Sequence, residues 1–115
     1  MAEPTPLPQG ELTRLTRAAA GGDEGAWSDL VRRFDAVLHA VAHRYRVGAD
    51  VDDVVQTVWL RALDHVDRID DPGAIAGWLV TATRREAMRV LQRSVHEIVT
   101  SDVTEHAHLA RAVRQ

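Results

Sequence analysis

The sequence of 115 residues contains no cysteine, no lysine and no long apolar run. Without cysteine, neither a disulfide framework nor a thiolate metal site can form, and a reducing compartment is allowed. No stretch approaches the roughly 20 apolar residues that span a bilayer, and the start MAEPTPLPQG lacks the basic-then-apolar pattern of a signal peptide. We therefore expect a cytoplasmic protein that does not contact a membrane.

Hydrophobic residues make up 45% of the chain and charged residues 27%, which is typical of a folded globular protein rather than a disordered one. The length suffices for one small domain, because a single core usually needs on the order of 100 residues. Three prolines among the first ten residues predict an extended arm over 1–10.

Apolar residues recur at three- and four-residue steps in four segments, which predicts an all-α bundle of about four helices. The first helix spans about 11–20 and ends at Gly21-Gly22. The second begins after Asp23, a side-chain cap, and ends at Gly48, where a left-handed backbone favours glycine. Its apolar stripe comprises Trp27, Leu30, Val31, Phe34, Val37, Leu38, Val41 and Tyr45.

The last two helices are also marked by capping residues. Asp50 is placed to cap the third helix, with further acids in its first turn. Asp71-Pro72 resembles a cap followed by proline at the first helical position, which opens a fourth helix over about 73–94. The apolar residues of 95–115 are too sparse for a stripe, so this segment is predicted to be a linker with partly helical character.

The net charge of −3 argues against nucleic-acid binding by itself, because polyanion binders gain affinity from a surplus of basic residues. The charge is unevenly distributed, however. Residues 50–71 hold seven acids against two arginines, whereas residues 84–93 hold four arginines against Glu86 alone. The chain therefore has one acidic segment followed by one basic segment.

Projection of the fourth helix at about 100° per residue separates an apolar side from an arginine-rich side. The apolar side comprises Leu79, Val80, Thr83, Ala87, Val90 and Leu91. The other comprises Trp78, Thr81, Arg85, Met88, Arg89, Gln92 and Arg93. Such a face suits phosphates, base edges and stacking of an unpaired base, although a solvated charged face with Trp78 packed at the end of the bundle fits the same pattern.

The run ADVDDVVQTVWLRALDHVDRI, followed by GWLVTATRREAMRVLQR, resembles region two of extracytoplasmic-function sigma factors of the sigma-70 family. The family's acidic helix falls on Asp50, Asp53, Val54, Val55, Gln56, Val58 and Trp59. Its aromatic-leucine helix rich in arginine falls on Trp78, Leu79, Arg84 and Arg85. The preceding segment 26–45 is similar to the family's first conserved segment.

The resemblance implies a non-enzymatic, DNA-binding subunit of RNA polymerase without a catalytic residue, cofactor or metal. The residues that dock on the clamp helices of the largest polymerase subunit are then Asp50, Asp52, Asp53, Gln56, Thr57 and Arg61. Those that engage the non-template strand of the minus-ten promoter element are Trp78, Thr81, Arg84, Arg85, Met88, Arg89, Gln92 and Arg93. Asp70 and Asp71 lie in the loop that captures a flipped base, and an anti-sigma factor is a further expected partner.

Two positions depart from the family pattern, because Thr57 replaces a common glutamate and Arg84-Arg85 replaces a common Arg-Asn pair. Full members also carry a helix-turn-helix domain that reads the minus-thirty-five element, for which nothing after Arg93 has room. We therefore expect a fragment, with 11–94 as the region-two domain and 95–115 as the linker towards an absent second domain.

Two other interpretations remain open. His39 and His43 are four residues apart on one helix, with Asp35 one turn earlier, which is a possible start of a metal site. The chain also fits a helical protein-interaction module that never contacts DNA. Salt-dependent binding to single-stranded minus-ten DNA in the presence of polymerase distinguishes that module from a sigma factor.

Overall fold

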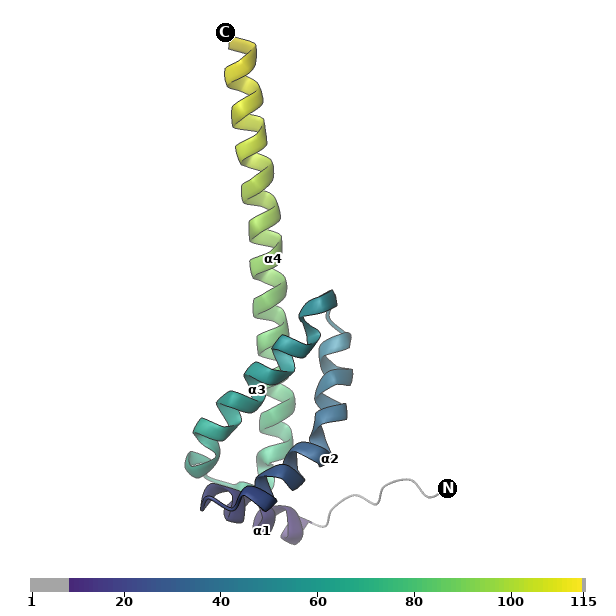
Figure 1. Cartoon of the computed structure of the whole chain (residues 1–115), viewed down its shortest axis with the longest axis vertical. Helices are drawn as coiled ribbons and strands as arrows, with labels where there is room; N and C mark the ends of the chain where they lie inside the picture. Colours follow the sequence, from purple (N-terminus) through teal and green to yellow (C-terminus); the bar gives the residue numbers. More distant parts are fainter. Residues whose placement is uncertain (1–8, 115) are drawn as a thin grey trace, which may run out of the picture.

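The computed structural model describes the backbone of residues 9–114 and the side chains of residues 10–100. Within these residues there is no strand, and the helices are α1 (Gln9–Ala20), α2 (Glu24–His43), α3 (Val51–His65) and α4 (Ile75–Arg114) (Figure 1). Short 3-10 turns, η1 (Gly48–Asp50), η2 (Val66–Arg68) and η3 (Pro72–Ala74), precede or connect them. The predicted all-α fold of four helices is confirmed.

The core lies where α2, α3 and the first half of α4 pack together, and α1 closes one end of the bundle against α2 and η3 (Figure 1). The large aliphatic side chains that are fully buried are Leu30, Leu38, Val54, Val55, Val58, Ile75 and Leu79. Burial of each stabilises the fold by about 1.5–3 kcal/mol. The core therefore combines valines of α3 with Leu79 on the apolar side of α4 and two leucines of α2.

Two threonines are also fully buried, and each satisfies its hydroxyl inside its own helix. Thr16 donates to the carbonyl oxygen of Leu12 at 2.8 Å, and Thr83 donates to that of Leu79 at the same distance. Because a buried hydroxyl without a partner is destabilising, these bonds explain how polar residues lie within the apolar faces.

Two of the predicted caps are confirmed. The Asp23 carboxylate accepts a hydrogen bond from the backbone N–H of Ala26 at 3.0 Å, at the start of α2. The Asp71 carboxylate accepts one from the backbone N–H of Gly73 at 3.1 Å, and Pro72 follows at the first position of η3. The chain then enters α4 at Ile75.

The region between α2 and α3 differs from the prediction. Helix α2 ends at His43 instead of continuing to Gly48, because Arg44 and Tyr45 form tighter i to i−3 backbone bonds that turn the chain. The turn buries Val47, and Tyr45 packs against the core from outside the helix. Gly48 has the expected left-handed conformation, with φ of +57°, but it opens η1.

Two side chains were also misplaced by the periodic pattern. Asp50 forms no side-chain capping bond. The turn η1 leads directly into α3, and the backbone N–H groups of Asp50 and Val51 already donate to the carbonyl oxygens of Val47 and Gly48. Val37, assigned to the stripe of α2, is 45% exposed. The predicted apolar stripe of α2 is therefore wider than the face that this helix buries.

Helix α4 does not end at Ser94 but continues to Arg114, so its 40 residues extend roughly 60 Å and project beyond the bundle (Figure 1). The segment 95–114 contains no glycine or proline that would break a helix. Val95, Ile98 and Val99 are more than half exposed on this projection. The role of 95–115 as an interdomain linker stays a prediction.

At the other end, Gln9 and Gly10 belong to α1 rather than to the predicted arm. Residues 1–8 of that arm lie outside the described residues. No helix in the described part of the chain combines the length and apolar character needed to cross a membrane.

Candidate DNA and partner surfaces

The outer face of α4 contains most of the residues that the helix projection assigned to it, together with Arg84, whereas Trp78 is half-buried. The opposite side is buried at Leu79, Thr83, Ala87 and Val90, and Val80 and Leu91 pack partly against the core. The exposed residues are Thr81, Arg84, Arg85, Met88, Arg89, Gln92 and Arg93. The division of α4 into a core side and an arginine-rich exposed side is therefore confirmed.

The arginines of this face differ in their internal partners. Among the described residues, Arg84 and Arg85 form no ion pair, so both guanidinium groups are available to an external anion. Arg93 lies beside the acidic start of α3, where it lines a groove of about 310 Å³ together with Asp50 and Asp53. The predicted DNA-binding and polymerase-binding sets therefore meet at this end of the bundle.

Glu86 is a residue of α4 that the helix projection assigned to neither side. Its side chain is 4% exposed, and its Oε2 atom lies 3.2 Å from Nη2 of Arg61 on α3 and 3.2 Å from Nη2 of Arg89 on α4. Arg89 also donates a hydrogen bond of 3.3 Å to Oε1. The position of Glu86 directly before the buried Ala87 and three residues before Arg89 was the available sequence signal.

Trp78 is half-buried at the start of α4 and stacks on His65 from the end of α3. The ring centroids are 5.4 Å apart and the ring planes differ by 14°. One face of the indole is therefore covered from within the protein, as the packing interpretation of Trp78 expected. In the adjoining loop, Asp71 is committed to its cap, while Asp70 is exposed and has no polar partner among the described residues.

The residues predicted to bind polymerase do not form one patch. Asp52 and Gln56 line a groove of about 400 Å³ between α2 and α3. Asp53 lies on the side of α3 that faces Arg93, with Thr57 half-buried one turn later. Two turns after Asp53, Arg61 reaches Glu86. Helix α3 thus divides the predicted set between an α2-facing and an α4-facing side.

The groove between α2 and α3 is more apolar than the acidic character of α3 suggested. Leu60 and Leu63 line it while 61% and 55% exposed, beside Trp27 and Val31 from α2. Trp59 packs edge-to-face on Trp27, with centroids 5.7 Å apart, and donates from Nε1 to the Asp35 carboxylate at 2.9 Å. The prediction missed both leucines, although their three-residue spacing on the third helix was a signal.

His39 stands at the rim of this groove between two carboxyl-bearing residues. Nδ1 lies 2.9 Å from the backbone oxygen of Asp35, and Nε2 lies 3.1 Å from Oδ1 of Asp52. The hydrogen bond to the Asp35 carbonyl raises the pKa of His39 above 6.5, and the two carboxylates add to this while desolvation opposes it. These contacts therefore stabilise the imidazolium form relative to an isolated histidine.

The same geometry argues against the metal interpretation of the histidine pair. Both ring nitrogens of His39 are engaged with Asp35 and Asp52, and His43 is exposed. Among the residues that the structure describes, no group of three or more His, Asp or Glu side chains is arranged to hold a metal ion.

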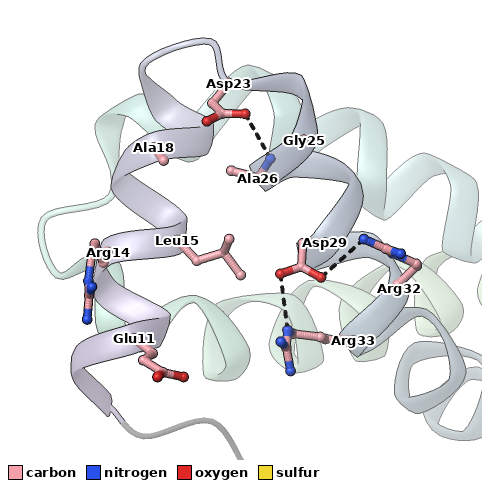
Figure 2. A pocket seen from close by; sticks show the side chains of 10 residues that line it. All are labelled: Glu11, Arg14, Leu15, Ala18, Asp23, Gly25, Ala26, Asp29, Arg32 and Arg33. Atoms are coloured by element: carbon pink, nitrogen blue, oxygen red, sulfur yellow. Dashed lines mark hydrogen bonds and ion pairs between the residues drawn. The ribbon is translucent and has the colours of Figure 1, made fainter.

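A further groove, of about 610 Å³, lies between α1 and α2, apart from both predicted surfaces (Figure 2). Leu15 points from α1 towards α2, and Asp29 on α2 pairs with Arg32 at 3.3 Å and Arg33 at 3.5 Å (Figure 2). Because its acids and arginines balance, this groove shows no preference for a ligand of one charge.

Comparison with known proteins connects these surfaces to a family. Residues 30–96 match the family described as sigma-70 region 2. The RNA polymerase sigma factor NccH of Alcaligenes xylosoxydans xylosoxydans is 36% identical over 66 residues, which cover 56% of this chain and 36% of that protein. The chain thus aligns with only about a third of this relative's length. The matched region contains α3, most of α2 and the part of α4 that packs in the bundle.

Proposed function

The chain belongs to the sigma-70 region 2 family and is of the extracytoplasmic-function type, and we propose that it directs RNA polymerase to promoters during transcription initiation. In this role it is a binding subunit and not an enzyme. The observation that carries the proposal is the outer face of α4, where Arg84 and Arg85 have no ion pair with any described residue and the half-buried Trp78 stands about two turns earlier.

We propose that this face engages the non-template strand of the minus-ten element. Arg84 and Arg85 contact phosphates, while Thr81 and Gln92 offer hydrogen bonds to bases or backbone. His65 covers one side of Trp78, so an unpaired base stacks on the other side. Flipping a base costs a few kcal/mol of unstacking, and contacts of the loop around Asp70 offset part of that cost.

We further propose that the groove between α2 and α3 receives the clamp helices of the largest polymerase subunit. An amphipathic helix binds a groove through apolar anchors, for which Leu60 and Leu63 provide the exposed surface. Asp52 and Gln56 at the rim give polar contacts to a basic partner, and Asp50 and Asp53 extend the acidic surface towards α4. An anti-sigma factor that blocks polymerase would compete for the same surfaces.

The domain organisation completes the proposal. We propose that residues 11–94 form the region-two domain and that 95–115 serve as a linker towards a promoter-reading domain. The match to sigma-70 region 2 ends at residue 96, close to the proposed boundary. Within α4, residues 95–114 continue the same helix that carries the proposed DNA-binding residues.

The proposal is tested by binding of a labelled single-stranded minus-ten oligonucleotide to the full chain in complex with core polymerase. We expect Arg84→Ala combined with Arg85→Ala to weaken DNA binding at least tenfold and to reduce the slope of log affinity against log salt by about 1 to 2. Core-polymerase affinity should stay unchanged, because neither residue lines the groove.

Arg14→Ala is the matched control, since Arg14 is an exposed arginine on α1 without an ion pair among the described residues. It should leave both affinities unchanged. A wild-type complex that binds polymerase but shows no salt-dependent binding of this DNA contradicts the sigma function and favours the protein-interaction module.

A further inference from the structure

We infer that Glu86 is a positioning residue for DNA binding, which holds Arg89 at the DNA surface with the help of Arg61 from the neighbouring helix. The inference rests on the proposed function, and it changes the role of one residue. Arg61 then acts through Glu86 on the DNA surface instead of contacting polymerase. From the sequence, Arg61 was assigned to polymerase and Arg89 to DNA, yet both arginines pair with the buried carboxylate of Glu86.

The geometry separates this contact from an ordinary surface ion pair. Glu86 is 4% exposed, whereas Arg61 and Arg89 are 45% and 61% exposed at their side chains. A buried carboxylate is strongly destabilising unless cations compensate it, and a single exposed pair contributes little. Each arginine therefore contacts Glu86 through Nη2 while about half of its side chain remains exposed.

The atom at the centre of this contact is Oε2. It lies at the same distance from both arginines but, within the described residues, accepts no hydrogen bond of good geometry. Its partners are therefore held by charge, and each arginine compensates the carboxylate when the other moves. Arg61 thus keeps Glu86 paired while Arg89 turns one of its donors towards a phosphate.

The opposite expectation follows if Glu86 only contributes negative charge. In that case Glu86→Gln removes an acid beside the arginine-rich face and makes DNA binding tighter, since polyanion affinity rises with net positive charge. If Glu86 positions Arg89, the same change weakens DNA binding. The sign of the effect therefore separates a positioning role from a simple electrostatic one.

The test is a double-mutant cycle on the full chain bound to core polymerase, with single-stranded minus-ten DNA as the probe. We expect Arg89→Ala to weaken DNA binding about threefold to tenfold in the wild-type background and less than about twofold in the Glu86→Gln background. Arg84→Ala, on the same face and without an ion pair to any described residue, should weaken binding by the same factor in both backgrounds.

Arg61→Ala gives a second route that leaves Glu86 paired with Arg89 and so preserves the fold if Glu86→Gln does not. We expect it to weaken DNA binding and to leave core-polymerase affinity unchanged. Lower polymerase affinity with intact DNA binding overturns the inference, as does an Arg89→Ala effect of equal size in the wild-type and Glu86→Gln backgrounds. Failure of the wild-type complex to bind the DNA at all contradicts the proposed function instead.

Discussion

The groove between α2 and α3 and the outer face of α4 belong to one small bundle, yet their surface chemistry is opposite. The groove exposes leucines between aromatic side chains, with an acidic residue at its rim. The face of α4 exposes arginines over a buried apolar side. The first suits a protein partner that brings its own apolar side chains, and the second suits a polyanion. A net charge of −3 therefore conceals two surfaces of different chemistry.

Both surfaces depend on the packing of α4 in the bundle. A substitution that disrupts this packing is therefore expected to have the largest effect. Leu79 is fully buried, so Leu79→Ala should lower the free energy of unfolding by about 2–5 kcal/mol through lost burial and a cavity. Urea denaturation measures this change, and both binding activities should fall together with the folded fraction. Val37→Ala, at an exposed valine of α2, should change stability by less than about 0.5 kcal/mol. Equal midpoints for the two variants would show that Leu79 does not support the core.

The second effect is specific to the groove. Leu60→Ala should weaken core-polymerase binding by about 1–2 kcal/mol, because an exposed leucine in an apolar groove is a candidate anchor, while stability and DNA contacts remain unchanged. Titration with a labelled core enzyme measures the affinity, and Val37→Ala again serves as the control. If Asp53→Ala weakens docking and Leu60→Ala does not, the docking surface lies on the α4-facing side of α3.

The smallest effect concerns the rim of the groove. Because the pKa of His39 is raised in the folded state, its contacts with Asp35 and Asp52 stabilise the fold below about pH 6.5, and this contribution is lost as pH rises through the folded-state pKa. His39→Gln should therefore destabilise the protein more at acidic than at alkaline pH. The effect is small because Asp52 is 90% exposed and exposed ion pairs contribute little. Thermal unfolding of both proteins across this range tests the sign, and a difference that grows with pH would contradict it.

Local patterns predicted the features that depend on local interactions. The caps at Asp23 and Asp71 and the left-handed Gly48 follow from the chemistry of single residues, and each is present. The two sides of α4 follow from helical periodicity. The end of α2 at His43 depends instead on the burial of Val47, which only tertiary packing determines.

The contents of the candidate sites were harder to predict for the same reason. Nothing near Glu86 in the sequence indicates that Arg61, on another helix, reaches its carboxylate. The acidic pattern of α3 likewise concealed the leucines that line the groove on its other side. Resemblance to a family indicated which helices matter, whereas the division of α3 between two faces required the packed structure.

The stack of His65 on Trp78 limits how many nucleotides could bind at the proposed stacking position. An indole has two faces, and the imidazole already occupies one, so at most one base fits against the ring. Trp78 is thus suited to mark a single position in a strand rather than to bind a run of consecutive bases.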